Sequence, residues 1–133
     1  LLLDLDDFKR VNDRHGHAEG DRLLRATARR IATVLRGTDL AARWGGEEFA
    51  LLLPGSGLDD AVAVAQRILA SLRELGAGEG DGRQTCTASI SVAAFAGGDE
   101  SFDRLVERAD RAMYAAKLAG KARVERAEPP HPG

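Results

Sequence analysis

The fold of this chain is decided by the stretch Leu40-Ala41-Ala42-Arg43-Trp44-Gly45-Gly46-Glu47-Glu48-Phe49-Ala50-Leu51-Leu52-Leu53. Its Gly-Gly pair divides two apolar segments, and such pairs form tight turns because glycine adopts backbone conformations that are closed to other residues. The pattern predicts a β-hairpin with strands over residues 40–44 and 47–53. Glu47 and Glu48 follow the turn directly. Carboxylates are poor material for a core, but they are suitable ligands for a divalent cation held against phosphates.

The rest of the chain alternates between short strands and amphipathic helices. Apolar residues that recur every three to four positions indicate helices with one buried face. We expect strands over 1–6, 85–95 and 122–126, and helices over 8–14, 19–35, 58–72 and 102–116. Ser101 is the expected N-cap of the last helix, and 76–82 is expected to be a flexible glycine-rich loop. The order β-α-β-β-α-β-α-β predicts a ferredoxin-like α+β fold, an antiparallel-containing sheet with its long helices packed on one face.

Length and composition indicate one ordinary globular domain of 133 residues. The net charge of −2 gives no field that favours bulk nucleic acid or an anionic membrane surface, so we expect no nucleic-acid partner. The single Cys86 excludes an intrachain disulfide and a cysteine-rich zinc site. No apolar run is long enough for a membrane span and no signal peptide is visible, so a cytoplasmic location is expected.

The two ends of the sequence carry their own expectations. The chain begins with Leu1-Leu2-Leu3-Asp4, without Met and already inside an expected strand, which predicts that N-terminal material is missing. Such missing regions could anchor the full-length protein to a membrane. Residues 128–133 contain three prolines and are expected to form a disordered tail.

Acidic residues also gather at the end of the first expected strand. Asp4 is followed by Asp6 and Asp7, and in a ferredoxin-like sheet this strand is a neighbour of the hairpin. Asp4 and Glu47 could therefore converge although they are far apart in the sequence. Converging carboxylates at strand ends are the usual protein contribution to a two-metal phosphoryl-transfer site. The alternative is a set of solvated acids at strand ends, and these residues alone leave both interpretations open.

Four blocks of sequence together closely resemble the GGDEF family of diguanylate cyclases. The blocks are Asp4-Leu5-Asp6-Asp7-Phe8-Lys9-Arg10-Val11-Asn12-Asp13, then Gly16-His17 with Gly20-Asp21, then Arg43-Trp44-Gly45-Gly46-Glu47-Glu48-Phe49, and finally Arg108-Ala109-Asp110 through Met113-Tyr114 and Ala116-Lys117 to Gly120-Lys121. The resemblance covers nearly the whole chain, in order and with the family's spacing. It implies a fold similar to nucleotidyl cyclases and polymerase palms, and a GGDEF domain over 1–127 that lacks its usual N-terminal segment.

The resemblance also implies a reaction. Members of the family condense two GTP molecules into cyclic di-GMP and release two pyrophosphates. The expected active species is a homodimer, in which each subunit binds one GTP and each ribose 3′-hydroxyl points at the α-phosphate of the other nucleotide. An upstream sensory domain that would set dimerisation is expected to be missing from this chain. The alternative is a catalytically silent module that binds GTP or cyclic di-GMP and regulates a partner domain, and the intact motif residues favour the enzyme.

The family's cation ligands correspond to Asp4, the backbone carbonyl of Leu5, Glu47 and Glu48. Ligands that are all oxygen suit Mg²⁺ or Mn²⁺, and the resemblance implies two ions per active site. Glu47 and Glu48 are also the expected catalytic residues, with Glu47 as the acid that takes the proton from the ribose 3′-hydroxyl.

The remaining groups of the nucleotide have matching residues as well. Asn12 and Asp21 match the guanine-binding pair, and a carboxylate that pairs with both donors of guanine would disfavour adenine. Outside the motif, Asn12 would be taken as a turn residue and Asp21 as a helix cap. The expected triphosphate contacts are backbone amides and lysines, namely Asp7, Phe8, Lys9, Gly45, Gly46, Lys117 and Lys121. Lys121 stands where the family usually has arginine, which keeps the charge but loses the bidentate geometry. Ser91 replaces a frequent glycine, with a small structural cost expected.

A second site is expected at Arg36-Gly37-Thr38-Asp39, an R-x-x-D motif at the spacing of the family's inhibitory site. Arg67, on the following helix, matches the family's second product-binding arginine. Arginine suits both phosphates and the Hoogsteen edge of guanine, so the resemblance implies feedback inhibition by cyclic di-GMP. The alternative interpretation of the motif is a helix-end arginine with a cap.

Overall fold

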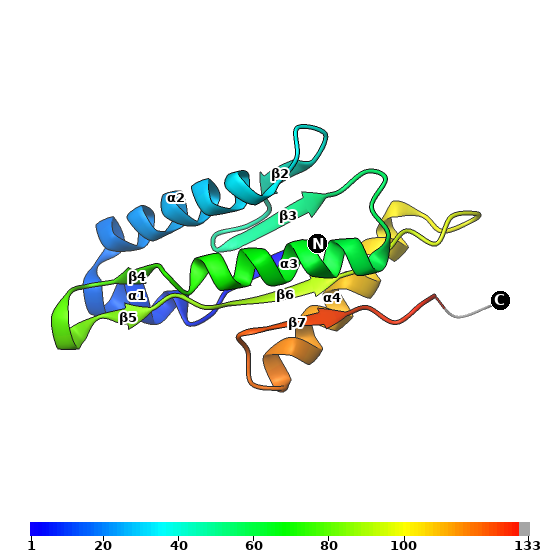
Figure 1. Cartoon of the computed structure of the whole chain (residues 1–133). Helices are drawn as coiled ribbons and strands as arrows, with labels where there is room; N and C mark the ends of the chain where they lie inside the picture. Colours follow the sequence, from blue (N-terminus) through cyan, green and yellow to red (C-terminus); the bar gives the residue numbers. More distant parts are fainter. Residues whose placement is uncertain (131–133) are drawn as a thin grey trace.

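The Gly-Gly turn joins two antiparallel strands, as the sequence predicts. In the computed structural model, which describes residues 1–130, β2 (Leu40–Arg43) pairs with β3 (Glu48–Leu52). Residues 44–47 form the tip of this hairpin (Figure 1). Within β3, Phe49 and Leu51 are buried against the core, whereas Glu48 is exposed. The alternation places the hairpin's acids outside the core and its apolar residues inside it.

The central strand of the sheet is β1 (Leu2–Leu5), which lies between β3 and β6 (Ala88–Val92) and is antiparallel to both. The last strand, β7 (Arg123–Arg126), adds to β6 in parallel and completes the order β2-β3-β1-β6-β7. Without β7 this is the strand order of a ferredoxin-like sheet, so the predicted α+β class is confirmed.

Helices cover both faces of this sheet, which corrects the expectation that the long helices share one face. α1 (Phe8–His15) packs against α2 (His17–Val34), and α2 packs against α3 (Leu58–Leu72) on one face. α4 (Phe102–Leu118) contacts β6, β7 and β1 from the other face. In Figure 1, α3 crosses in front of the sheet and α4 emerges from behind it.

The serines of β6 are the reason why the sequence does not indicate that the second face of the sheet is covered. Ser89 and Ser91 alternate with apolar residues, a pattern typical of a strand with one solvent-facing side. In the structure all the residues of β6 are buried. The helix that covers the serines does so with small side chains, the buried Ala109, Ala112 and Ala116 of α4. Because these side chains are small, α4 approaches the sheet closely over polar residues.

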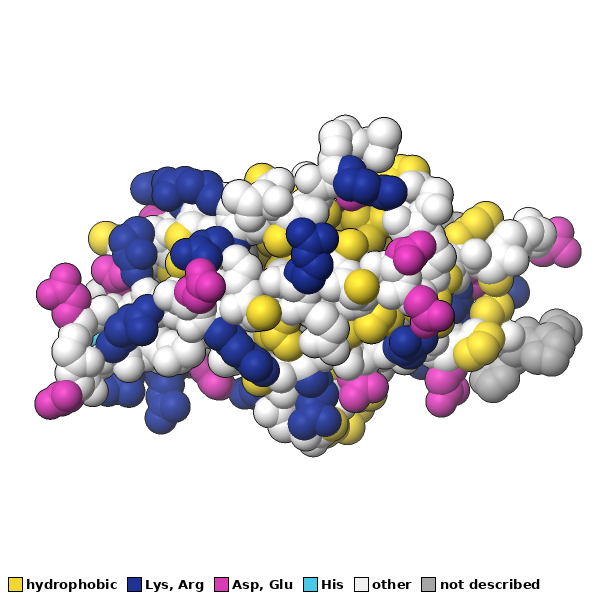
Figure 2. All heavy atoms as spheres, viewed as in Figure 1, with side chains coloured by type: hydrophobic (Ala, Val, Ile, Leu, Met, Phe, Trp, Pro, Cys, Tyr) yellow, Lys and Arg dark blue, Asp and Glu magenta, His cyan; other side chains and the backbone are white. Residues whose placement is uncertain are grey.

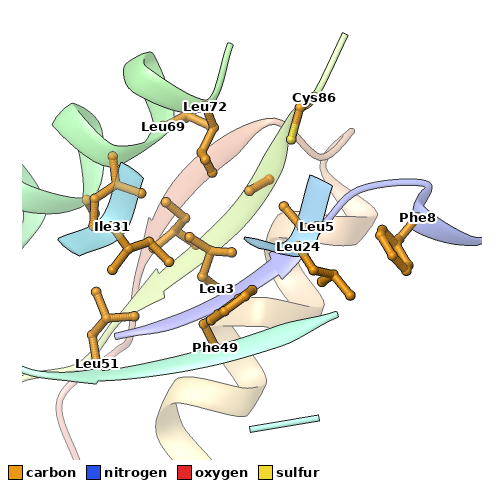
Figure 3. Close-up of a cluster of buried hydrophobic side chains, with 14 of the residues drawn as sticks. Leu3, Leu5, Phe8, Leu24, Ile31, Phe49, Leu51, Leu69, Leu72 and Cys86 are labelled. Carbon is orange, nitrogen blue, oxygen red and sulfur yellow. The ribbon is translucent and has the colours of Figure 1, made fainter. Parts of the chain in front are cut away.

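The main core fills the space between the sheet and helices α2 and α3 (Figure 3). Its largest fully buried apolar side chains are Leu3, Ile31, Leu51, Ile68, Leu72, Ile90 and Val92. Each such side chain contributes roughly 1.5–3 kcal/mol when it is removed from water. The core therefore fixes β1 firmly between its neighbours, together with the acids at the end of that strand.

The segment expected to be a flexible glycine-rich loop forms a small hairpin instead. It consists of β4 (Gly76–Ala77), the 3₁₀ turn η1 (Gly80–Gly82) and β5 (Gln84–Thr85). The single strand expected over 85–95 is therefore divided into two, the end of β5 and the whole of β6. The guanidinium of Arg22 in α2 donates to the Gly76 carbonyl, and the Cys86 amide donates to the Leu75 carbonyl at 3.0 Å. These contacts join residues far apart in the sequence, and local composition does not reveal them.

A buried ion pair fastens the start of α4. Ser101 caps the helix as expected, since its hydroxyl accepts from the Arg104 amide at 3.2 Å. Arg108 donates from Nε and Nη2 to the Glu100 carboxylate, both at 2.8 Å, and both side chains are at most 5% exposed. Arg108 also donates to the carbonyls of Ala94 and Glu128. The pair therefore joins the loop before α4 to the chain that follows β7. The tail expected over 128–133 lies partly outside the described residues, at 131–133.

Exposed charges of both signs are interspersed over the face formed by α2 and α3 (Figure 2). Two pairs on this side, Arg22 with Glu19 and Arg30 with Glu74, bring opposite charges together. Within residues 1–130, no helix combines the length and the apolar character needed to cross a membrane.

The two serines of β6 predict opposite effects of the same substitution. The Ser91 hydroxyl is buried and has no hydrogen-bond partner within residues 1–130, whereas the Ser89 hydroxyl donates to Asp6 at 2.7 Å. Ser91→Ala should raise the free energy of unfolding by about 1 kcal/mol, because an unpaired buried hydroxyl is costly. Ser89→Ala should lower it by about 1–2 kcal/mol, because a hydrogen bond to a charged group is lost. Urea unfolding measures both, and effects of equal sign would contradict the assignment.

Candidate functional site

The acids predicted to converge lie at neighbouring strand ends. Asp4 of β1 is in register with Glu48 of β3, and the Leu5 amide donates to the Glu47 carbonyl at 3.1 Å. Asp4 is on the sheet face covered by α4, because Leu3 and Leu5 occupy the opposite face within the core. Strand pairing thus brings Asp4, Leu5, Glu47 and Glu48 to one place.

The environment of Asp4 opposes its ionisation. The pKa of Asp4 is raised to about 6, mainly by burial; nearby Lys117 opposes this shift, and the negative charges of Glu47 and Glu48 add to it. The Asp4 side chain is 19% exposed, and its Oδ1 lies 3.6 Å from the Lys117 ammonium. The site therefore carries negative charge that the surrounding protein only partly balances. A bound cation would complete that balance.

Asp6, two positions further on, has the opposite character, and no role for it follows from the motif. Its Oδ1 accepts from the Lys117 ammonium and the Ser89 hydroxyl, both at 2.7 Å. Its Oδ2 accepts from the Thr87 hydroxyl and the Ala122 amide, both at 2.9 Å. Burial opposes its ionisation, but these four hydrogen bonds outweigh that effect and hold the pKa of Asp6 below its ordinary value. With two donors on each oxygen, Asp6 has little capacity left to bind a metal ion.

Two lysines stand on the α4 side of the acids. Lys117, near the end of α4, contacts Asp6 closely and Asp4 at longer range. Lys121 follows the helix and places its ammonium 2.8 Å from Asp7, which raises the pKa of Lys121. Two of the three predicted phosphate-binding lysines are thus brought to the acidic site, each paired with an aspartate of the first motif.

The start of α1 supplies further predicted phosphate contacts. Asp7 precedes the helix in a left-handed conformation, with φ of 55°, and Phe8 is its first residue. The Phe8 side chain is buried in the core, so its backbone amide is the group available for a ligand. Lys9 is exposed. Amides at the start of a helix suit an anion.

The Gly-Gly turn is held by an arginine for which the motif indicates no separate role. Arg43 donates from Nε to the carbonyls of Gly45 and Gly46, both at 3.1 Å, and from Nη2 to Gly46 at 2.6 Å. The Gly45 amide donates to the Glu48 carbonyl at 3.3 Å, so this amide is already used within the turn. The signal for Arg43 was its place directly before the turn, where a long side chain can reach back to the turn carbonyls.

The predicted base-recognition pair is built at the junction of two helices. Asn12 lies on α1 and Asp21 lies exposed on α2. A Cβ at Gly20 would lie 1.9 Å from Asn12 Oδ1, so only glycine leaves room for the Asn12 side chain. The Asn12 side chain therefore packs against Gly20, which directly precedes Asp21 in α2.

The R-x-x-D motif forms a closed pair on the other side of the hairpin. The Arg36 guanidinium donates to Asp39 at 3.1 and 3.3 Å, and the Arg36 amide donates to the same carboxylate at 2.8 Å. These hydrogen bonds hold the pKa of Asp39 below its ordinary value. Arg36 also donates to the Pro54 carbonyl and the Ser56 hydroxyl. Arg67 lies exposed on α3. The geometry is compatible with a ligand site and with a structural cap.

The residues fit a cation that is shared with a ligand rather than one enclosed by protein. Within residues 1–130, no three histidine, cysteine or acidic side chains are grouped closely enough to hold a metal ion by themselves. The donors at the strand ends are all oxygens, which Mg²⁺ and Mn²⁺ prefer. Mg²⁺ is commonly bound through one or two carboxylates together with substrate phosphates and water.

Known proteins are similar to this chain in sequence and in fold. Residues 1–123 match the family model described as diguanylate cyclase, GGDEF domain. The chain is 45% identical over 124 residues to diguanylate cyclase DgcM of Escherichia coli K12, an alignment that covers 93% of this chain and 29% of DgcM. This chain therefore spans less than a third of that relative.

Two solved structures show the similarity in three dimensions. The active GGEEF domain of a diguanylate cyclase from Vibrio cholerae has a TM-score of 0.86 at 27% identity, covering 97% of this chain and 81% of that one. The coiled coil and GGDEF domain of DgcB from Caulobacter crescentus, in complex with c-di-GMP, has a TM-score of 0.82 at 30% identity, covering 95% and 67%.

The raised pKa of Asp4 predicts a pH-dependent stability effect. The pKa of about 6 in the folded chain exceeds the ordinary 3.8, so ionised Asp4 destabilises the fold above pH 6 and the penalty disappears below pH 4. At pH 7.5, with EDTA present to remove divalent cations, Asp4→Asn should raise the free energy of unfolding by about 1 kcal/mol. This is less than the full pKa shift would give, because solvent screens the partly exposed carboxylate. Urea unfolding at several pH values tests this. A gain that persists unchanged at pH 3.5, or a loss at pH 7.5, would contradict it.

Proposed function

The chain belongs to the GGDEF family of diguanylate cyclase domains, and on this premise we propose that it condenses two GTP molecules into cyclic di-GMP and two pyrophosphates. The observation that carries the proposal is the meeting of acids and lysines at one end of the sheet. Asp4 is in register with Glu48, and the ammonium groups of Lys117 and Lys121 lie on the α4 side. An acidic cation site beside ammonium groups matches the charge distribution of a metal-bound triphosphate.

The cation would be held by Asp4, the Leu5 carbonyl, Glu47 and Glu48. The raised pKa of Asp4 supports this assignment, since a group short of positive charge gains most from a cation. We infer Mg²⁺ or Mn²⁺, two ions per active site. When bound, such ions neutralise phosphate charge and make the ribose 3′-hydroxyl easier to deprotonate.

The base and the triphosphate would be bound by separate parts of the chain. Asn12 and Asp21 would pair with guanine, and adenine would leave the Asp21 carboxylate without its two donors. Lys117 and Lys121 would contact the triphosphate, with Lys9 and the amides of Asp7, Phe8 and Gly46; the Gly45 amide, which the sequence predicted as a further contact, is instead bonded to the Glu48 carbonyl. Lys121 would leave Asp7 and contact a phosphate instead. Its positive charge would then be balanced by the phosphate in place of the aspartate.

The chemical step requires two copies of this domain. The 3′-oxygen of each GTP forms a bond to the α-phosphorus of the other, and at each phosphorus the bond to the bridging oxygen of the departing pyrophosphate breaks. Glu47 accepts the proton of the attacking hydroxyl, and Glu48 supports the charge of the site. Since one site holds one nucleotide, the reaction needs a two-fold symmetric homodimer, and most of the rate comes from positioning. Regions beyond this chain would control that dimerisation.

Glu47→Gln is the test of the catalytic assignment. The substitution keeps the shape of the side chain but removes the base, so cyclic di-GMP formation should fall at least about a hundredfold. Glu79→Gln, an exposed residue of the β4–β5 hairpin, is the matched control and should retain the parental rate. Mass spectrometry of the products from GTP and from ATP measures both rate and base selectivity. Parental product formation by Glu47→Gln would overturn the assignment.

We further propose that Arg36, Asp39 and Arg67 form a product-binding site that mediates feedback inhibition. Support comes from the motif spacing, from the exposure of both arginines, and from the solved DgcB structure that contains c-di-GMP. A phosphate of the product would replace Asp39 on part of the Arg36 guanidinium, whose fork suits both partners. The structural-cap alternative predicts no effect of the product.

Arg36→Ala separates these two possibilities. If the site binds product, the variant should need at least about tenfold more cyclic di-GMP for half-inhibition, measured against its own uninhibited rate, because charge-assisted hydrogen bonds are lost. Arg30→Ala, which removes an arginine paired with Glu74, serves as the control with parental inhibition. Inhibition of Arg36→Ala at the parental concentration would rule out the product site.

A further inference from the structure

Asp6 is the one carboxylate of the motif with a nearly complete set of internal hydrogen bonds. Its side chain is 1% exposed, and it joins the end of β1 to the start of β6 and to the segment that follows α4. The donors are the hydroxyls of Thr87 and Ser89, the Lys117 ammonium and the Ala122 amide. Asp6 takes no direct part in the proposed reaction.

We propose that Asp6 is a positioning residue that holds Lys117 and the turn at 121–122 in place for the triphosphate. The inference rests on the proposed function, because it names what prepares that same site. Asp6 does not touch the substrate itself. It acts through the two lysines that would.

The first part of this role is to keep Lys117 away from Asp4. The Lys117 ammonium lies 2.7 Å from Asp6 and 3.6 Å from Asp4. Without the charge of Asp6, the nearest carboxylate for Lys117 is Asp4, the proposed cation ligand. A close pair between Lys117 and Asp4 would use the acid needed for the cation and the ammonium needed for the phosphates. Asp6 prevents this by offering Lys117 the shorter contact.

The second part concerns the backbone after α4. Lys121 and Ala122 both have left-handed conformations, with φ of 64° and 50°, which residues with a Cβ adopt at a cost. The hydrogen bond from the Ala122 amide to Asp6 stabilises this turn, together with the bond from the Lys121 amide to the Ala116 carbonyl at 2.9 Å. The turn directs the Lys121 side chain to Asp7 at the start of α1. Loss of Asp6 would therefore disturb both lysines at once.

The structural donors can be separated from the lysine by substitution. Thr87→Val removes one donor and keeps both the charge of Asp6 and a residue suited to a strand. Asp6→Asn removes the charge with little change of shape. Lys117→Met removes the group through which Asp6 is proposed to act. Asp59→Asn is the matched control, because the Asp59 side chain is 89% exposed and pairs only with surface Arg126 among the described residues.

The test measures binding of 3′-deoxy-GTP in Mg²⁺ by titration calorimetry. This probe lacks the attacking hydroxyl, so it reports triphosphate binding without turnover. Asp6→Asn and Lys117→Met should each weaken binding about ten- to a hundredfold, since a charge-assisted contact is lost or misplaced. The double variant should lose less affinity than the two single losses multiplied, because Asp6 and Lys117 share one contact, and any loss beyond that of Lys117→Met reflects the effect of Asp6 on Lys121. Asp59→Asn should bind with parental affinity.

Several results would overturn the inference. One is that Asp6→Asn binds 3′-deoxy-GTP with parental affinity. Another is that the loss of affinity in the double variant equals the product of the two single losses, which would indicate that Asp6 and Lys117 act independently. Circular dichroism establishes that each variant is folded. If Asp6→Asn does not fold, Thr87→Val decides the matter: a severalfold loss of affinity that becomes smaller in the Lys117→Met background supports positioning, and parental affinity, or a loss of equal size in both backgrounds, opposes it. A parental chain that binds no 3′-deoxy-GTP refutes the proposed function and, with it, the ligand of this inference.

Discussion

The antiparallel pairing of β1 with both β3 and β6 is the constraint on which the rest of the structure depends. Because β1 is central, its register fixes the neighbours of Asp4, with Glu48 on one side and Ser89 on the other. Leu3 and Leu5 are buried under α2 and α3, which leaves Asp4 on the face of α4. A slip of one residue would place the acid in the apolar core and is therefore excluded. The register of one four-residue strand thus sets the geometry of the acidic site.

Two aspartates on the same side of this strand end have opposite electrostatic properties, and hydrogen bonding is the reason. Burial disfavours the charge of both. Asp6 receives four donors and remains ionised easily, whereas Asp4 has two acidic neighbours and a more distant ammonium. A carboxylate with filled acceptor positions organises the protein around it. One with free acceptor positions in a negative environment is suited to a cation. The same residue type therefore serves two purposes.

Ion pairs hold helix α4 at two points along its length. Arg108 and Glu100 fasten its N-terminal half, and Lys117 with Asp6 fastens its C-terminal end. Between these points, alanines lie close over the serines of β6. Because the helix is anchored in this way, the backbone of Lys117 has little freedom to move. This suits its proposed contact with the triphosphate, which depends on accurate positioning. The same helix, α4, therefore covers the second face of the sheet and positions a lysine of the candidate site.

Features that depend on residues close together in the chain are predictable from the sequence. The hairpin at Gly45-Gly46, the Ser101 cap and the helical periodicities are local signals, and the motif spacing identified the family. Tertiary structure alone decided that α4 covers the second face, that 76–85 folds as a small hairpin, and that Asp6 differs from Asp4. The reason is physical. The four donors to Asp6 come from positions 81 to 116 residues away, and propensity and periodicity, which act over a few residues, contain no information about such partners.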